Sequence, residues 1–377
     1  MIFLIFSSIE FLLWFLPIFL IVYGITPRKY RNLTLLVGSI VFYARGDVRY
    51  LPLLMISILC NYFLGLHLAK RSPKTLWRKK LLLILTLGAN LAVLLWFKDW
   101  GGSAGLPLGI SFYTFQILSY QIDVYRGEVS REYSFLKFAT YVIMFPKLIS
   151  GPITRYGDIS DSLTERTFTV RGLEDGMKLF ILGLAAKVLL ADRVGILWHE
   201  VQVTGFESIS TPLAWLAAIA YSMEIYFDFW GYSLMAMGLG RMMGIELPAN
   251  FRRPYMARRL KFVHKMKVLP HIYLWLVIPM SWMCFAITDL SQLQVYLDKM
   301  LWLVPGFSGG YEDAWKALST YGGLLLVSGL ACTPVIEKLY HKWQDKLPVK
   351  VLLSGLFWYC IWRLLLEGNN PFMYFSF

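Results

Sequence analysis

Long runs of apolar residues, separated by short polar or basic segments, follow one another along the whole chain. The runs are continuous, which is typical of membrane helices and not of the short alternating strands of a membrane barrel. Helices are expected because lipid offers no hydrogen-bond partner to an unpaired backbone group. The runs cover residues 2–25, 33–44, 50–69, 81–97, 106–125, 135–153, 176–197, 212–243, 271–288, 321–336 and 351–366. They predict an all-α, polytopic transmembrane helical bundle of about 10–11 membrane segments.

The composition excludes a water-soluble globule and supports this interpretation. Hydrophobic residues make up 57% of the 377 residues, charged residues make up 16%, and the mean hydropathy is +0.54. Soluble domains contain roughly 45–50% apolar and about 25% charged residues. We therefore expect a single membrane domain over residues 1–377, with the lipid bilayer as its main partner. Residues 2–25 are interpreted as the first membrane helix, because the run is too long and too apolar for a cleaved signal peptide.

The net charge of +13 is explained by basic loops. Basic clusters at 28–31 and 70–80 are separated by two apolar runs, so both can face the cytoplasm under the positive-inside rule. The chain has no aromatic–basic RNA motif, zinc finger or basic heptad arm, and we expect no nucleic-acid partner.

The cysteines and histidines show no pattern of a metal or nucleophile site. The four cysteines lie in apolar stretches without a CxxC spacing. The five histidines lie outside the polar membrane stretches, and no HExxH, GxSxG or phosphate-binding glycine loop is present. We therefore expect no metal site, and we interpret the histidines as interface residues.

Polar residues inside apolar runs are the first functional suspects, because an ionisable group at membrane depth is costly. Glu224 and Asp228 flank Tyr226 in an aromatic segment, and a spacing of four residues places both carboxyl groups on one helix face. The segment predicts either a polar pocket that holds a substrate or a structural ion pair within the bundle.

Three further residues are candidates for the same passage. Gln116 belongs to a run that is unusually rich in polar residues, which either line a channel or bond to neighbouring helices. Arg252 and Arg253 follow a helix-breaking stretch and predict either an anion site or a basic loop at lipid headgroups. In residues 146–152, two prolines and a glycine predict a broken helix.

At these motifs the chain resembles the membrane-bound O-acyltransferase family, and within it the bacterial alginate O-acetyltransferase branch. The resemblance extends over nearly the whole chain. It is carried by 106–126 (LPLGISFYTFQILSYQIDVYR), 145–155 (FPKLISGPITR), 221–233 (YSMEIYFDFWGYS), 235–254 (MAMGLGRMMGIELPANFRRP) and 369–377 (NNPFMYFSF).

The resemblance implies a ring of membrane helices around a tunnel in a bacterial inner, or cytoplasmic, membrane. It further implies acetyl-CoA as the donor on the cytosolic side and the hydroxyls of an extracytoplasmic polysaccharide, such as alginate, as acceptors. Periplasmic or membrane-anchored acetyltransferases would be the partners. Gln116, Glu224, Tyr226, Asp228, Arg252 and Arg253 are the candidates for lining the tunnel.

The chain departs from the family where the family carries its histidines. Members of the family have a tryptophan- and arginine-rich stretch and then a tunnel histidine after the segment that ends here at residue 254, and neither feature is present. The pattern indicates an internal deletion near residues 258–262, so the catalytic role is not transferred to His264 or His271.

Three hypotheses follow from the sequence. The chain is an O-acyltransferase, or a catalytically impaired member of the family that acts as a scaffold or remnant, or a transporter whose polar helices form a substrate path. The missing histidines favour the second hypothesis over the first at the level of mechanism. The transporter is the weakest of the three, because the sequence shows no internal repeat.

Overall fold

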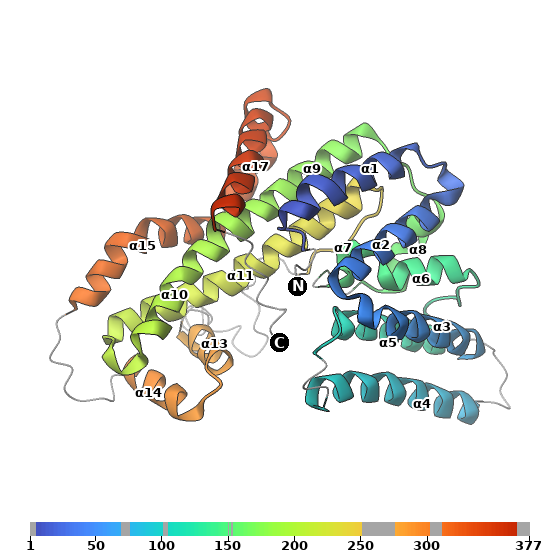
Figure 1. Ribbon diagram of the computed structural model, residues 1–377, viewed down its shortest axis with the longest axis horizontal. Helices are drawn as coiled ribbons and strands as arrows, with labels where there is room; N and C mark the ends of the chain where they lie inside the picture. Colours follow the sequence, from blue (N-terminus) through green and yellow to red (C-terminus); the bar gives the residue numbers. More distant parts are fainter. Residues whose placement is uncertain are drawn as a thin grey trace, which may run out of the picture. The chain divides into compact units, whose positions relative to one another are not determined.

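The computed structural model describes residues 5–68, 76–100, 105–149, 151, 154–250, 276–301 and 311–367. These residues are predominantly helical and contain no strand (Figure 1). The chain divides into two compact units: unit 1 comprises Met1–Gly183 and Tyr232–Asn250, and unit 2 comprises Leu184–Gly231 and Phe251–Phe377. Helices α9 and α11 each contribute residues to both units. The prediction of one membrane domain stays a prediction.

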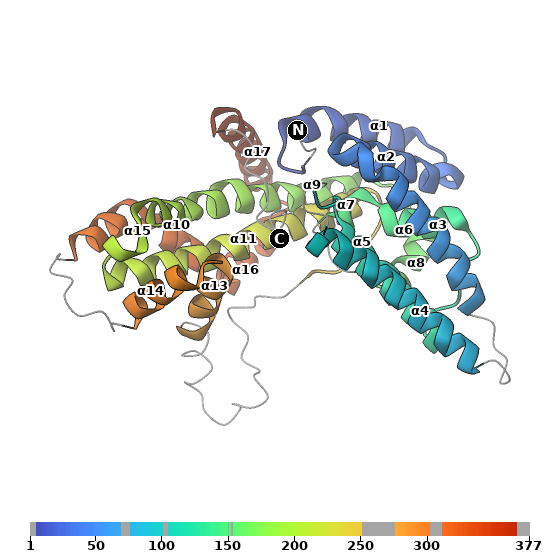
Figure 2. The ribbon, with the colours of Figure 1, turned by 60° about the horizontal axis from the view of Figure 1, so that its bottom comes forward.

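In unit 1, helices α2, α3 and α5 form the centre: α2 packs against α1 and α6, and α3 packs against α5 and α6 (Figure 1). Helix α4 packs against α5 (Figure 2). The helices are α1 (Leu16–Ile25), α2 (Arg31–Asp47), α3 (Leu51–Leu68), α4 (Leu76–Leu95), α5 (Ile110–Arg126), α6 (Phe135–Ile143), α7 (Phe145–Leu148), α8 (Tyr156–Thr164), and most of α9 (Val170–Ala185).

Aromatic side chains fill the core of unit 1. Phe6, Phe11, Phe42, Phe145 and Tyr232 are all fully buried. The ring of Phe6 stacks on that of Tyr232 with centroids 4.8 Å apart, and it meets the Phe145 ring edge to face at 6.4 Å. Such pairs stabilise a core beyond the area that they bury.

Two short helices occupy the run 135–153, and the second ends at Leu148, inside the predicted break at 146–152; residues 150 and 152 lie outside the described residues. Helix α6 begins at Phe135, after the cap residue Ser134, whose side chain accepts a hydrogen bond from the backbone of Lys137, and it ends before the non-helical residue Met144. Helix α7 then starts with Pro146 in its first turn, where the missing N–H of proline costs nothing. The run 135–153 is thus divided among short helices.

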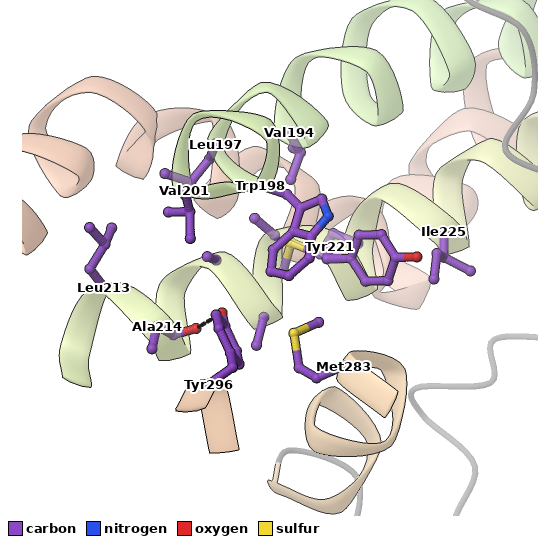
Figure 3. Packing of buried hydrophobic residues seen from close by; sticks show 14 of the residues in the cluster. Val194, Leu197, Trp198, Val201, Leu213, Ala214, Tyr221, Ile225, Met283 and Tyr296 are labelled. Atoms are coloured by element: carbon purple, nitrogen blue, oxygen red, sulfur yellow. Dashed lines mark hydrogen bonds between the residues drawn. The ribbon is translucent and has the colours of Figure 1, made fainter. Parts of the chain in front are cut away.

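In unit 2, helix α10 packs against α15, and η6 packs against α17. The core lies between α10, α11, α13 and α14, where Trp198, Tyr221, Met283 and Tyr296 are buried together (Figure 3). The Tyr296 hydroxyl donates to the Ala214 carbonyl at 2.7 Å. The helices are η6 (Ala186–Ala191), α10 (Asp192–Thr204), most of α11 (Thr211–Met242), α13 (Ile278–Ala286), α14 (Leu290–Met300), α15 (Glu312–Ala331), α16 (Pro334–Trp343) and α17 (Leu347–Glu367).

Three helices among the described residues are long and apolar enough to cross a membrane: Arg28–Leu68, Trp77–Lys98 and Leu347–Glu367. Helices α15 and α16, which bend by 63° where they meet, count as a fourth if they form one span. The all-α, polytopic prediction is confirmed. The total of about 10–11 segments and the tunnel stay predictions; several predicted runs, such as 135–153, form shorter helices instead.

A close contact between α9 and α11 within unit 1 generates a test. A Cβ atom on Gly238 would lie 2.6 Å from the Gly176 carbonyl oxygen and 2.7 Å from the Phe180 amide nitrogen. We expect Gly238→Ala to lower the free energy of unfolding by about 1–3 kcal/mol, because backbone atoms must move to admit the methyl group. Denaturation of the purified chain in detergent measures the change.

Gly88→Ala is the matched control, because nothing lies within 4 Å of a Cβ atom at this exposed helical position. We expect it to stabilise the chain by about 0.5–1 kcal/mol, the usual gain from alanine in a helix. Equal effects of the two substitutions would contradict the close packing of α9 on α11.

Candidate functional site

A lysine held by two carboxylates forms the most charged buried cluster that the structure describes in unit 2. Lys187 Nζ lies 2.8 Å from Asp192 Oδ1 and 2.7 Å from Asp228 Oδ1. Lys187 is 2% exposed and Asp228 is 1% exposed. Charges buried to this degree are tolerated only when they are paired, because the low dielectric interior penalises a lone ion.

A π-helical turn brings Lys187 and Asp192 together. Both belong to the continuous helix α9–η6–α10, in which Ala186–Ala191 forms the π-helix η6. The Asp192 amide donates to the Lys187 carbonyl, the i→i+5 bond of a π-helix. In a regular α-helix, residues five apart are turned by about 140° from each other. The extra residue in the turn therefore aligns the two side chains.

Asp228 comes to the same lysine from helix α11. Glu224 lies one turn earlier on that helix, which confirms that α11 carries both carboxyl groups at helical spacing. Asp228, Lys187 and Asp192 all act electrostatically on Glu224. Polar chemistry in this part of unit 2 is thus concentrated between η6 and the middle of α11.

Glu224 differs from Asp228 in forming no ion pair with Lys187 among the described residues, whereas Asp228 Oδ1 lies 2.7 Å from Lys187 Nζ. Its Oε2 atom is buried and has no hydrogen-bond partner among the described residues. The carboxyl group packs against Gly195, where an added Cβ atom would overlap it. Glycine at position 195 therefore makes the room that Glu224 occupies.

Tyr226 lies between the two carboxylates in the sequence and is almost completely buried. Its ring stacks on that of Trp230 one turn later, with an interplanar angle of 8° and centroids 5.9 Å apart. Tyr226 and Trp230 share a face of α11 that is two residues, about 200°, away from the face of Glu224 and Asp228.

Gln116 belongs to a separate polar cluster in unit 1. Its Oε1 atom accepts a hydrogen bond from Lys147 Nζ at 2.9 Å, and Lys147 is fully buried with its ammonium 3.8 Å from the centre of the Tyr141 ring. The cation–π contact and the amide oxygen stabilise the lysine charge in place of a carboxylate. The Gln116 Nε2 atom has no hydrogen-bond partner among the described residues.

Other polar residues of unit 1 bond to neighbouring helices, the second interpretation that the sequence left open. Gln121 Nε2 donates to the Asn61 carbonyl at 2.7 Å, and the Asn61 side chain pairs with that of Asn90 at 3.0 Å. These amides join helices α3, α4 and α5. Hydrogen bonds of this kind hold membrane helices together without forming a reactive site.

Arg252 and Arg253 lie outside the described residues, as do His264, His271 and the junction at 258–262. Of the histidines that the structure describes, His67 bonds to the Phe63 carbonyl at 2.8 Å and His199 is exposed on α10. The candidate roles of the tunnel residues stay predictions. Within the described parts of the chain, no group of three His, Cys, Asp or Glu side chains is placed to hold a metal ion.

The sequence did not assign Lys187 and Asp192 to the site. Lys187 was visible as a charge in an apolar run, but a spacing of five residues does not predict contact on an α-helix. Only the π-helical turn brings the side chains of Lys187 and Asp192 together, and the local sequence AKVLLA gives no sign that such a turn will form.

Comparison with known proteins now adds to this geometry. The model of the membrane-bound O-acyltransferase family matches residues 69–267. The chain belongs to this family. The probable alginate O-acetylase AlgI of Pseudomonas putida is 39% identical over an alignment of 277 residues that covers 68% of this chain and 56% of that protein. The probable alginate O-acetylase AlgI of Pseudomonas aeruginosa is also 39% identical over an alignment of 277 residues, which covers 68% of this chain and 53% of the relative.

Another relative is the peptidoglycan O-acetyltransferase of Helicobacter pylori. It is 33% identical over an alignment of 309 residues that covers 68% of this chain and 58% of that protein. The chain therefore spans little more than half the length of the curated relatives it matches. This partial coverage fits the internal deletion that the sequence indicates near residues 258–262.

The buried ion cluster of this O-acyltransferase family member predicts a large effect of one neutral substitution. We expect Asp228→Asn to lower the free energy of unfolding by about 3 kcal/mol, because it removes the most deeply buried carboxylate of the cluster and leaves the buried ammonium of Lys187 only the more exposed Asp192. Unfolding of the purified chain by a denaturing detergent measures the change.

Glu207→Gln is the control, since it removes the same charge from an exposed residue of unit 2. We expect it to change stability by less than about 0.5 kcal/mol. If Asp228→Asn proved as mild as Glu207→Gln, the Lys187–Asp228 pair would have no structural importance.

Proposed function

We propose that this chain takes part in the O-acetylation of a cell-envelope polysaccharide, with acetyl-CoA as the acyl donor on the cytosolic side. The observation that carries the proposal is the set of relatives in the family. An alginate O-acetylase and a peptidoglycan O-acetyltransferase each match about two thirds of this chain at 33–39% identity. Two different sugar polymers are named, so the proposal extends to polysaccharide hydroxyls and takes alginate as one example.

The cluster on η6 and α11 supports acyl transfer through its free carboxyl oxygen. An acceptor hydroxyl must lose a proton as it attacks the thioester carbon, and general base catalysis contributes about 10²–10⁴-fold to such a step. Lys187 is held between Asp192 and Asp228, so the lysine charge and these two carboxylates are already engaged with one another. Glu224 is left to receive the proton, and we propose it for that role.

The same proposal specifies the membrane location of the chain, its partners and the path of the acyl group. The chain would lie in the inner, cytoplasmic, membrane of a bacterium as a multi-pass protein, since three of its helices are long and apolar enough to span a bilayer. An acetyl group delivered to the outer side would be received by periplasmic or membrane-anchored acetyltransferase partners. Gln116, Arg252 and Arg253 remain candidates for lining the path of the acyl group.

A second candidate function is that of a catalytically impaired scaffold that still docks the partner transferases. It is favoured by the missing histidine motifs after residue 254 and by the short coverage of the relatives. A family member without its general base would lose most of the rate that proton transfer supplies. The transporter hypothesis has no comparable support.

Polymer acetylation in a strain that relies on this gene alone separates the candidates. We expect acetyl esters on the secreted polysaccharide above the level of an empty vector. Glu224→Gln should lower them by about 10²-fold or more, because the amide cannot take up the proton. Glu207→Gln should leave them unchanged, because residue 207 is exposed and distant in the sequence from the cluster.

The alternatives give different results in the same strain. No acetylation by the unaltered chain, together with co-purification of a partner acetyltransferase, would establish the scaffold. Flux of a substrate into vesicles without acetyl-CoA would establish a transporter. Normal acetylation by Glu224→Gln would contradict the role of Glu224 and leave the acyltransferase assignment intact.

A further inference from the structure

Two arginines lie next to each other in unit 1, and neither pairs with a carboxylate of the described residues. Arg31 begins helix α2, and Arg166 lies in the segment between α8 and α9. Arg31 Nη1 donates to the Arg166 carbonyl at 3.3 Å. Both guanidinium carbons also lie within 6 Å of the centre of the Tyr23 ring, at 5.8 Å for Arg31 and 5.7 Å for Arg166. The two cations therefore share one aromatic side chain.

Each guanidinium is fixed by neutral oxygen atoms. Arg31 Nε donates to the Thr26 carbonyl at 3.4 Å. Arg166 Nε donates to the Tyr23 hydroxyl at 2.6 Å, and its Nη1 donates to the Ser162 carbonyl at 3.4 Å. The Tyr23 hydroxyl in turn donates to the Met243 carbonyl at 2.9 Å. These bonds orient the guanidinium groups but leave both positive charges without a counter-charge.

The positive charges of Arg31 and Arg166 are not balanced by any carboxylate of the described residues, and this suggests a bound anion. Arg31 is only 9% exposed, and no ion pair to Arg31 or Arg166 occurs within the described ranges. The Arg166 Nη2 group is buried and makes no hydrogen bond to any described residue. A buried charged donor without a partner is costly, and two adjacent cations add their mutual repulsion. An anion that binds both arginines would remove both costs.

The position of the pair along the chain indicates which anion it would meet. Helix α1 ends at Ile25, and its residues Ile21 and Ile25 are 65% and 77% exposed. Within one further turn Pro27, Arg28 and Lys29 are exposed. A surface that changes from apolar to basic over so few residues is typical of the boundary between the hydrocarbon core and the headgroups. Phosphate is the abundant anion at that depth.

We propose that Arg31 and Arg166 form a binding site for the phosphate group of an anionic phospholipid. Guanidinium groups donate parallel N–H bonds that match the geometry of phosphate oxygens, and they do so better than lysine. Tyr23 holds the two groups next to each other, and the Arg166 Nη2 group supplies the donor that is still free. The site is independent of the acyl-transfer proposal, because it uses no residue of the η6–α11 cluster.

Binding of a phosphatidylglycerol titrated into the full-length chain in a maltoside detergent, which contains no phosphate, tests the proposal. Native mass spectrometry measures the fraction of protein that retains the lipid. We expect Arg31→Gln and Arg166→Gln each to weaken retention by roughly tenfold or more, the effect of losing a charge-assisted hydrogen bond. Arg31→Lys and Arg166→Lys should fall between, since they keep the charge and lose the forked geometry.

Arg28→Gln is the matched control, because it removes the same charge from an exposed residue three positions from Arg31. We expect it to leave lipid retention within about twofold of the unaltered chain, since exposed charges contribute little. An equal loss of lipid retention in Arg28→Gln would show that the lipid is held only by diffuse attraction to the basic loop. That result would overturn the proposed site. Arg31→Lys and Arg166→Lys control for misfolding, because they keep the positive charge that the folded chain already accommodates at each position.

A second experiment tests whether the site binds the lipid or a soluble phosphate. Inorganic phosphate and phosphatidylglycerol are compared as ligands that raise the unfolding temperature of the chain in detergent. We expect the lipid to stabilise the unaltered chain but not Arg166→Gln, as a ligand that binds only the folded state must. Stabilisation by inorganic phosphate without stabilisation by the lipid would overturn the lipid assignment. No binding of either ligand would mean that the arginines only brace backbone carbonyls.

Discussion

The pairing of buried charge is the constraint on which the rest of this structure depends. Lys187 lies almost without solvent contact in a helix that the sequence otherwise makes apolar, and an ammonium in such a place must be neutralised locally. Asp192 and Asp228 do this from 2.8 Å and 2.7 Å. To reach the lysine, Asp192 requires a π-helical turn, and Asp228 requires α11 to lie against that turn. A single buried cation thus determines both a local helix type and a packing arrangement.

The need to pair buried charges also makes Glu224 a candidate for a chemical role. A third carboxyl group beside one lysine exceeds what the lysine can neutralise, and one of its oxygens has no partner among the described residues. A membrane protein that carries such a group at the expense of stability is expected to use it, because intramembrane carboxylates are costly to retain. In the O-acyl transfer that we propose for this chain, Glu224 would take up the proton of the acceptor hydroxyl. The missing histidine motifs make this carboxyl group more important, since no described histidine lies in the cluster.

Much of the architecture could be predicted from the sequence, because hydrophobic periodicity and proline position act locally. Helix α7 ends at Leu148, inside the stretch 146–152 where the prolines and glycine predict a break, and the spacing of Glu224 and Asp228 placed both on α11. The contacts of Gln116 and Lys187 could not be predicted, because they join residues whose meeting depends on tertiary packing or on an irregular turn. Lys147, 31 residues from Gln116, is a partner that no local pattern indicates.

A double-mutant cycle between Lys187 and Asp228 tests the central claim most directly. Lys187→Met and Asp228→Asn are measured singly and together by equilibrium unfolding in detergent. A buried ion pair predicts that each single variant is strongly destabilised and that the double variant is less destabilised than the sum, with a coupling of about 2–3 kcal/mol. Additive effects within about 0.5 kcal/mol would contradict the account, because they would mean that the two groups do not interact in the folded chain.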